Sequence, residues 1–336
     1  MSFVRNLFIK VIRDNEVANW FGRRIVKGLI KVVRPLEKLT TMYRIYGTVK
    51  LKVSNVEFKI YDRADDHIAN DIYYCLGYED AEFLLLKQLI KRSRYMVDVG
   101  ANTGIFSIYA ASLNSGLEVL SFEPHPSNYK RLLTNVSINK LNNIKAYDCA
   151  LGPSDSEIEF TIPADMSIST TSSANDGFTR NFHRLEYVKV PVRQKKLDDI
   201  LANIPVTSAD VFKIDVEYYE LEVLKGAEAT LRNKRPMIII ELLDYSSLVT
   251  QFPQMEGNVD KSHAHDIINF LTKIGYHPYA IGTDGLHAID AKRNSRNFLF
   301  IPHKLSREDI AFEEISAVLA ESPQLLASIP GTTAWL

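Results

Sequence analysis

The sequence has few cysteines and no long apolar run. Its 336 residues include only Cys75 and Cys149, too few for a disulfide framework and typical of a protein in a reducing compartment. No apolar stretch reaches the ~18 residues that a membrane-spanning helix needs. No basic-then-apolar signal segment opens the sequence, so the expected location is cytoplasmic. These absences argue against a disulfide-rich secreted domain and against an integral membrane protein.

Charge is unevenly distributed along the chain, although the net charge is only −1. Residues 1–50 hold 11 Lys and Arg against 3 Asp and Glu, a net charge of +8, and the remainder carries −9. Because a phosphate backbone is bound by a basic face, the acidic body argues against a nucleic-acid partner. The apolar fraction of 46% is ample for a globular core, in one large domain with extensions or in two small ones.

The basic segment at the start of the sequence predicts an amphipathic helix that Pro35 ends. Its apolar stripe consists of Phe21, Ile25, Leu29, Val32 and Val33. Such a helix can lie among the headgroups of an anionic membrane, which makes residues 1–40 a candidate for peripheral contact with the inner face of a membrane. The alternative is that the stripe packs on the body of the protein or on a second subunit of a homo-oligomer.

Alternating patterns of strands and helices predict an α/β fold. A hairpin is expected at residues 48–61 around Ser54 and Asn55, and a helix at about 79–92. From residue 95 onward strands and helices take turns, which is typical of a mostly parallel sheet. Seven strands are expected, at 95–99, 118–123, 144–148, 210–214, 237–241, 276–281 and 296–301. Helices are expected near 104–112, 126–139, 219–232 and 263–274, with a last one beginning at Ser306.

The first strand of this series runs into a glycine turn, "VDVGANTG". In an open α/β sheet the ligand lies beyond the carboxyl ends of the strands, close to this turn. A nicotinamide-binding turn would read G-x-G-x-x-G, but Asn102 and Ile105 occupy the second and third glycine positions. Asp98 followed by Gly100 and Gly104 instead suits an amino acid, whose carboxylate meets the helix N-terminus and whose ammonium lies near the acid.

The second strand ends in another acid, Glu123 in "FEPHP". An acid at this position can accept hydrogen bonds from both hydroxyls of a ribose. The turn at 148–152, "DCALG", follows the third strand and is placed to cover an adenine edge with backbone groups. An amino acid joined to a nucleoside is S-adenosylmethionine, which is therefore the expected cofactor. An NAD(P)-dependent enzyme on a similar sheet is the alternative.

A series of motifs resembles the FkbM family of S-adenosylmethionine-dependent methyltransferases, from about residue 75 to residue 303. The motifs are "VDVGANTG", "FEPHP", "ALG", "VPVRQKKLDDIL", "VFKIDVEYYELEVLKGAEATL", "RPMIIIELL" and "NFLFIP". The resemblance implies a class I, Rossmann-like fold with helices on both faces of the sheet, and methylation of hydroxyls of sugars or polyketides. Together with the turns, it implies that the cofactor is held by Asp98, Gly100, Ala101, Asn102, Thr103, Gly104, Glu123, Pro124, Cys149 and Ala150.

The resemblance also implies that Asp215, Glu217 and Glu241 line the acceptor side of the site. Asp215 and Glu241 end adjacent strands, and two carboxylates there could bind sugar hydroxyls, act as a base or jointly hold Mg²⁺. Alternatively, Asp215 caps the following helix and Glu241 pairs with a lysine. Family members usually have glycine where this chain has Tyr218, and a positive φ at a tyrosine costs about 1 kcal/mol or more.

These observations predict a methyltransferase that uses S-adenosylmethionine to methylate a hydroxyl of a sugar in a glycan, glycolipid or related metabolite. A non-catalytic cofactor-binding scaffold at a membrane assembly is the alternative from another class. The Ser/Thr-rich segment 164–177 is long and polar enough to be a lid. The expected organisation is a basic helical leader at 1–45, a methyltransferase domain at 46–304 with a cofactor half at 95–152 and an acceptor half at 153–304, and a helical tail at 305–336.

Overall fold

The computed structural model describes most of the chain between residues 15 and 303. The described residues are 15–30, 40, 43–64, 66–76, 80–164, 172–182, 186–282, 285–289, 296–303, 305, 316–317 and 319. Three predictions fall outside them: the end of the leader helix at Pro35, residues 165–171 of the expected lid, and the start of the last helix at Ser306.

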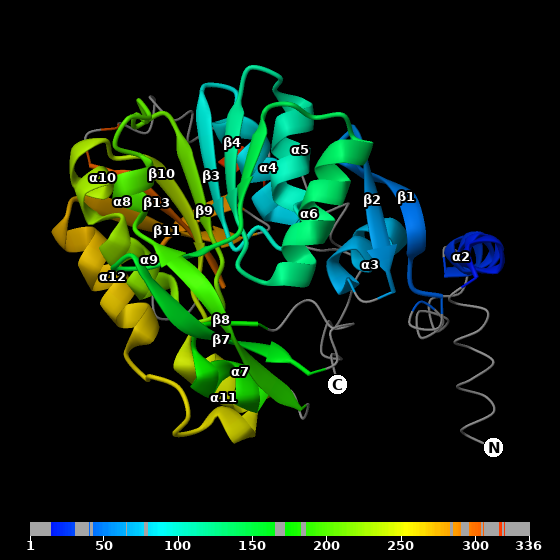
Figure 1. The fold of residues 1–336 in the computed structure, drawn as a ribbon. Helices are drawn as coiled ribbons and strands as arrows, with labels where there is room; N and C mark the ends of the chain where they lie inside the picture. The colour runs from blue at the N-terminus through cyan, green and yellow to red at the C-terminus, as the bar shows by residue number, and fades with distance from the viewer. Residues whose placement is uncertain are drawn as a thin grey trace.

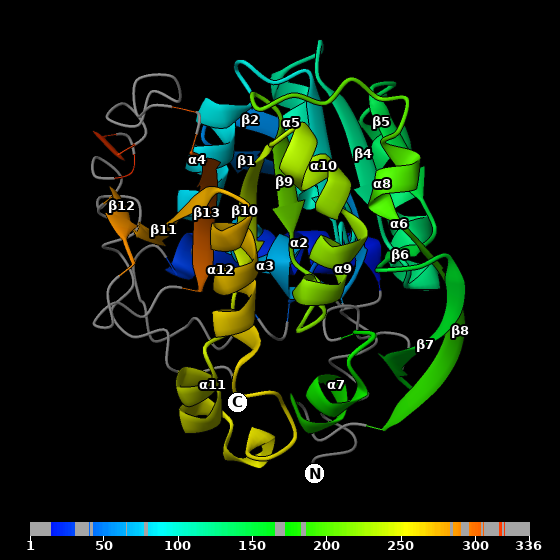
Figure 2. The ribbon, with the colours of Figure 1, turned by 90° about the vertical axis from the view of Figure 1, so that its left-hand side faces the viewer.

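An eight-stranded sheet forms the centre of the protein, in the order β12-β11-β13-β10-β9-β3-β4-β5 (Figures 1 and 2). The five strands from β5 to β10 are parallel, and β13, β11 and β12 are antiparallel to their neighbours. The bounds are β3 Tyr95–Val99, β4 Glu118–Phe122, β5 Ile144–Tyr147, β9 Val211–Ile214, β10 Met237–Glu241, β11 Tyr276–Gly282, β12 Gly285–Ala288 and β13 Asn297–Pro302.

The mostly parallel sheet is confirmed, but it has eight strands where seven were expected. The additional strand, β12, has only four residues and pairs with β11 alone. A strand this short carries almost no period-two pattern, which is why the sequence did not reveal it.

Helices cover both faces of the sheet, as the resemblance implies (Figure 2). Alternate residues of a strand point to opposite faces, so Met96 packs toward one layer of helices and Val97 toward the other. The first layer contains α4 Asp80–Leu89, α5 Ile105–Leu113 and α6 Pro126–Ile138. The second contains α8 Leu197–Ile200, α9 Glu220–Gly226, α10 Glu228–Asn233 and α12 His263–Lys273. The strands of the sheet are therefore buried between two apolar cores.

The single helix expected at 219–232 is wrong, because α9 and α10 are separate. The Asp198 carboxylate accepts hydrogen bonds from Ala229 N at 2.9 Å and Thr230 N at 2.7 Å, and so caps the start of α10. At the end of α9, Gly226 lies against backbone: a Cβ there would be 2.0 Å from Gly152 O. Because the helix is broken after Gly226, the end of α9 packs closely against the turn that follows β6.

The N-terminal hairpin agrees with the prediction. Its strands are β1 Tyr46–Val53 and β2 Val56–Arg63, and Ser54 and Asn55 form the turn with φ of 44° and 70°. The hairpin packs against α5 and α6, and Asn135 of α6 ties it to the glycine turn. Its Oδ1 accepts from Tyr61 N at 2.7 Å, and its Nδ2 donates to Thr103 O at 2.9 Å. The hairpin is therefore joined to the core and not a separate appendage.

A smaller sheet lies at the carboxyl edge of the main sheet, below it in Figure 1, in the order β6-β8-β7. Its strands are β6 Ala150–Leu151, β7 Ser156–Pro163 and β8 Tyr187–Lys195. Three short elements gather beside it around Phe178, Leu248 and Met255. They are α7 Asp176–Phe182, α11 Tyr245–Gln251 and the 3-10 helix η2 Pro253–Met255. The sequence analysis did not predict β7 or β8, and α7 begins inside the segment expected to be a loop.

Two further helices belong to the N-terminal part: α2 Glu16–Ile30 and α3 His67–Tyr74. The helix predicted for the leader is confirmed over the residues of α2. The Asp66 side chain caps α3 through Ala69 N. None of the described helices combines the length and the apolar character needed to cross a bilayer.

We expect Gly226→Ala to destabilise the protein by about 1–3 kcal/mol, because the new methyl group would displace the Gly152 backbone. Gly28→Ala in α2 is the matched control. A Cβ at Gly28 meets nothing within 4 Å, so alanine there should stabilise the helix by about 0.5–1 kcal/mol. Denaturant unfolding of both variants measures the difference. Equal stabilisation by the two alanines would contradict the close contact at Gly226.

Candidate functional site

The glycine turn after β3 allows no side chain at its first position. Gly100 has a φ of +80°, and a Cβ there would lie 1.9 Å from Asp215 O. Gly104 has a φ of +88°, and its Cβ would lie 2.3 Å from a Leu132 methyl carbon. The N–H groups of Gly100 and Ala101 both donate to Phe122 O at 3.0 Å. These contacts hold the turn against the ends of the neighbouring strands β4 and β9.

Glu123 is fixed beside this turn by two backbone donors. Asn102 N donates to Glu123 Oε2 at 2.7 Å, and His125 N donates to Oε1 at 2.8 Å. Each carboxylate oxygen keeps a further lone pair for a ligand hydroxyl. Because the side chain is only 5% exposed, burial raises its pKa to about 7 in spite of these donors. The carboxylate is therefore pre-oriented, and its charge depends on pH near neutrality.

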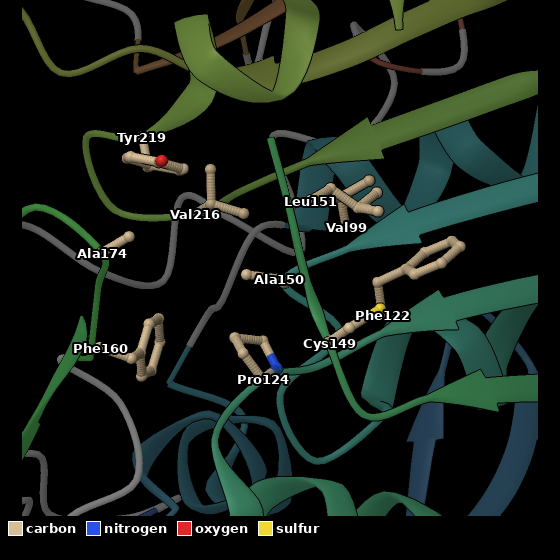
Figure 3. A pocket seen from close by; sticks show the side chains of 11 residues that line it. Val99, Phe122, Pro124, Cys149, Ala150, Leu151, Phe160, Ala174, Val216 and Tyr219 are labelled. Carbon is tan, nitrogen blue, oxygen red and sulfur yellow. The ribbon is translucent and has the colours of Figure 1, made fainter. Parts of the chain in front are cut away.

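A small, mostly apolar pocket opens next to the turn (Figure 3). Four of the expected cofactor-binding residues line it: Gly100, Pro124, Cys149 and Ala150. Burial raises the pKa of the Cys149 thiol to about 11, so this cysteine is an apolar liner and not a reactive thiolate. The lining has the character needed to receive a flat, uncharged ring.

Three elements that the sequence analysis did not assign to the site complete the pocket (Figure 3). Phe160 comes from β7, Ala174 from the end of the Ser/Thr-rich segment, and Tyr219 from the loop before α9. Tyr219 is held by a 2.9 Å hydrogen bond from its hydroxyl to Gln194 Oε1 of β8. Part of the segment expected to be a lid thus borders the pocket.

One polar atom at the turn lacks a partner. Asn102 has a φ of 52°, and its Oδ1 is buried with no hydrogen bond from the described part of the chain. A buried acceptor without a donor is unfavourable unless a ligand or water supplies one. Together with the Glu123 carboxylate and the apolar pocket, this atom fits a ligand with donor groups and an apolar ring, as S-adenosylmethionine has.

Asp98 and Thr103, also expected to hold the cofactor, are turned toward protein groups. Asp98 is 1% exposed and accepts a hydrogen bond from Ser107 Oγ, and burial raises its pKa. The Thr103 hydroxyl donates to Asp66 Oδ2 at 2.6 Å, beyond the turn. In this structure both side chains anchor the turn, so direct contact of either with a cofactor stays a prediction.

On the acceptor side, Lys213 lies at the centre of a charged group that we call the Lys213 cluster, comprising Glu82, Asp98, Lys213 and Asp215. Lys213 Nζ is 2.9 Å from Asp215 Oδ2 and 4.4 Å from the centre of the Phe106 ring. Its charge also acts on the pKa values of Asp98 and Glu82. Burial raises the pKa of Glu82 to about 7, opposed by Lys213 and by a hydrogen bond from Asn297. The cluster joins α4 to the ends of β3 and β9.

Glu82 was missed by the sequence analysis. It lies on α4, whose apolar pattern predicts a helix but does not show that one acid is only 7% exposed. Glu82 is brought to the sheet because Phe83, Leu85 and Leu86 beside it are fully buried. In the sequence, Glu82 is a charged residue next to apolar core positions, and this pattern could have identified it as a buried acid.

The other two acceptor-side acids lie at neighbouring strand ends. Glu241 is the half-buried last residue of β10 and pairs in register with Asn297 of β13. Glu217 has a φ of 55°, and its carbonyl accepts a 2.6 Å hydrogen bond from Ser173 Oγ. Among the described residues, no three histidine, cysteine or acidic side chains are grouped as a metal site requires. The joint role proposed for Asp215 and Glu241 in holding Mg²⁺ therefore gains no support.

Tyr218 has the positive φ that the resemblance predicts, 72°. Its ring is 3% exposed and stacks between Phe178 and His263, at centroid distances of 5.3 and 4.2 Å. Its hydroxyl donates to Asp260 O at 2.9 Å. Burial of an aromatic ring can contribute more than the ~1 kcal/mol expected for the strained backbone. The tyrosine thus joins the acceptor-side loop to α7 and α12.

Glu220 stabilises the same loop from within. Its Oε1 accepts hydrogen bonds from Val216 N at 3.2 Å and Tyr218 N at 3.1 Å, and its Oε2 lies 2.7 Å from His263 Nε2. A side chain that satisfies two backbone donors of a tight loop fixes the conformation of that loop. The orientation of Asp215 and Glu217 therefore depends on a network that includes α12.

Comparison with known proteins gives a family match over this region. A family model described as "Methyltransferase FkbM domain" matches residues 98–278, more than half of the chain. A methyltransferase sdnD from Sordaria araneosa is 27% identical over 218 residues, 55% of this chain and 82% of that protein. A hexuronic acid methyltransferase AglP from Haloferax volcanii is 26% identical over 195 residues, 55% of this chain and 75% of that protein.

Two further matches cover smaller parts of the proteins compared. A methyltransferase 1 from Beauveria bassiana is 27% identical over 161 residues, which are 45% of this chain and 65% of that protein. Among solved structures, a methyltransferase FkbM from Methylobacillus flagellatus KT matches with a TM-score of 0.38 and 18% identity, covering 70% of this chain and 55% of that one. The matched segment contains the glycine turn, Glu123, the pocket and the acceptor-side acids, and by this match the chain belongs to the FkbM methyltransferase family.

Proposed function

We propose that this protein transfers the methyl group of S-adenosylmethionine to a hydroxyl of a sugar, in a glycan, glycolipid or related metabolite. The observation that carries the proposal is the direct contact between the glycine turn and the acceptor-side loop. Asp215 N donates to Val99 O at 3.0 Å, and Asp215 O lies where a side chain at Gly100 would be. A cofactor at the turn and an acceptor at Asp215 would be neighbours, as a direct transfer requires.

The cofactor half of the proposal rests on Glu123, Asn102 and the apolar pocket. Glu123 would accept hydrogen bonds from ribose hydroxyls, and Asn102 Oδ1 would accept one from a cofactor donor group. Pro124, Cys149 and Phe160 would enclose the adenine ring. S-adenosylmethionine supplies an activated methyl group, so the protein has to bind both substrates in line and to manage the proton of the hydroxyl.

The acceptor half rests on the acids around Lys213. Asp215 has the more exposed side chain of its ion pair, at 21% against 7% for Lys213, and so offers a carboxylate oxygen toward the edge of the sheet. Lys213 Nζ contacts Oδ2 at 2.9 Å, and the two carboxylate oxygens of Asp215 have further lone pairs that can accept hydrogen bonds from hydroxyls. The name of the hexuronic acid methyltransferase, 26% identical to this chain, supports a sugar as the acceptor.

The proposed function is tested by incubating the purified protein with methyl-labelled S-adenosylmethionine and a panel of free sugars, uronic acids and lipid-linked sugars. Label is expected on a hydroxyl oxygen of at least one sugar acceptor, located by mass spectrometry of the product. Label on a nitrogen or carbon atom, or binding of NAD in place of S-adenosylmethionine, would contradict the proposal.

We expect Glu123→Gln to weaken S-adenosylmethionine binding by about ten- to a hundredfold. A hydrogen bond to a charged acceptor contributes roughly 1.5–3 kcal/mol to binding, and the variant would lose it. The wild-type pKa of about 7 adds a signature: affinity should fall as pH drops through 7 and Glu123 takes up a proton. The variant should lack this pH dependence. Calorimetry at several pH values measures both effects, and an unchanged affinity would remove Glu123 from the cofactor site.

Asp215→Asn should bind S-adenosylmethionine normally and lose roughly a hundredfold or more in turnover. Asparagine keeps the volume, and the contact with Gly100 is made by the backbone carbonyl, which is unchanged. Glu222→Gln is the matched control, since it removes a carboxylate of α9 whose ion pair in the described part of the chain is with the exposed Lys225. Full turnover by Asp215→Asn would make Asp215 a structural residue.

Glu82 is expected to set the pH dependence of turnover at saturating cofactor. With a pKa of about 7, it is protonated below neutrality and ionised above. If it accepts the acceptor's proton, directly or through Asp215, kcat rises with pH through about 7 and levels off above. Glu82→Gln should lower the plateau and flatten this rise. A variant whose pH profile matches that of the wild type would exclude Glu82 from the proton transfer.

A further inference from the structure

Helix α2 buries two polar side chains, Asn19 and Arg23, together with Val26. Asn19 is fully buried, donating from Nδ2 to Arg44 O at 2.9 Å and accepting at Oδ1 from Tyr46 N at 3.3 Å. Arg23 is 2% exposed and lies 5.4 Å from the centre of the Tyr73 ring. In a helix that only covers a protein core, these positions would be apolar.

The outward face of α2 carries five large apolar side chains. They are 42–66% exposed and comprise Val17, Trp20, Phe21, Ile25 and Leu29. These five are among only eight large apolar side chains that are exposed in the described part of the chain. Isolated apolar residues at a surface are ordinary, but five on one face of a 15-residue helix mark an interaction surface.

This arrangement decides between two expectations from the sequence. Packing of the stripe on the body of the protein is wrong for Phe21, Ile25 and Leu29, the described members of the predicted stripe. The buried Asn19 and Arg23 also prevent the helix from turning its apolar face inward. Such a rotation would break the hydrogen bonds of Asn19 to the backbone of Arg44 and Tyr46. The apolar face is thus held outward by specific polar contacts.

Basic side chains are exposed on α2 and on the hairpin that it contacts. Arg24 of α2 lies over the Trp20 ring at 4.1 Å. α2 contacts β1 and lies outermost beyond the hairpin (Figure 1). The exposed residues of that hairpin include four basic side chains and one acid: Lys50, Lys52, Lys59 and Arg63, with Glu57. An apolar helix face with a tryptophan and a basic border complements the headgroup region of an anionic bilayer.

We propose that α2 binds the surface of a membrane that contains anionic lipid, with Trp20, Phe21 and Ile25 inserted among the headgroups. The alternative occupant is a second copy of this chain. A helix of this length is about 22 Å long and about 10 Å wide, so its face covers on the order of 200 Å². A stable protein interface needs about 800 Å² per partner. A bilayer has no such requirement, because each apolar side chain and each basic residue adds to the binding separately.

The test is co-sedimentation of the full-length protein with vesicles of phosphatidylcholine, with and without phosphatidylglycerol. Binding is expected with phosphatidylglycerol at low salt, and it should weaken at high salt because the basic residues contribute through screened attraction. The double variant Phe21→Ser/Ile25→Ser should bind at least tenfold more weakly. Both side chains are exposed, so the fold and S-adenosylmethionine binding should be unchanged.

Leu133→Ser/Val188→Ser is the matched control, since it removes two exposed apolar side chains elsewhere on the surface. It should bind vesicles like the wild type. Equal loss in both double variants, or no binding of the wild type to phosphatidylglycerol vesicles at low salt, would overturn the proposal. A wild-type dimer that Phe21→Ser/Ile25→Ser dissociates, without vesicle binding, would assign the face to a second copy. None of these readouts depends on the methyl acceptor, so the membrane proposal and the proposed reaction fail or stand separately.

Discussion

The site depends on the closeness of two backbones at the carboxyl edge of the sheet. Gly100 and Asp215 directly follow the neighbouring parallel strands β3 and β9, and a Cβ at Gly100 would lie 1.9 Å from the Asp215 carbonyl oxygen. Because that space is closed to side chains, the glycine turn and the loop that begins at Asp215 take up a single relative position. This contact sets the relative positions of two groups of side chains. Glu123 and Asn102 lie on one side of it, and the Lys213 cluster lies on the other.

Features encoded over short stretches could be predicted from the sequence. The strands that contain Asp98 and precede Glu123, and the glycine turn between them, were predicted correctly. A parallel strand, a glycine turn and an acid at a strand end are all local sequence patterns. The hairpin turn at Ser54 and Asn55 is equally local. The division of the helix at 219–232 could not be read, because the Asp198 carboxylate that caps α10 is about thirty residues away in sequence. The inward Glu82 and the pocket residue Phe160 likewise depend on contacts between distant segments, which periodicity does not record.

Tyr218 shows how a departure from the family's usual residue is accommodated. A glycine at this position would take the positive φ without strain but would leave the space between Phe178 and His263 empty. The tyrosine keeps the strained backbone and gains a buried ring and a hydrogen bond to Asp260 O. The acceptor loop is consequently fastened to α7, which begins beside the pocket residue Ala174. Substitutions in α7 or α12 would therefore shift the loop that holds Asp215 and Glu217 without any change among the acids themselves.

The hairpin shares its hydrophobic core with the segment that the family model matches. The family match begins at residue 98, yet Leu51, Phe58 and Ile60 of the hairpin are buried in the same core as Ile108 of α5. Asn139, which caps the end of α6, exchanges two hydrogen bonds with the backbone of Lys59, so α6 is also held by β2. The core of this chain thus includes residues outside the segment that the family model matches. It extends to the hairpin, whose first strand begins about fifty residues before that segment.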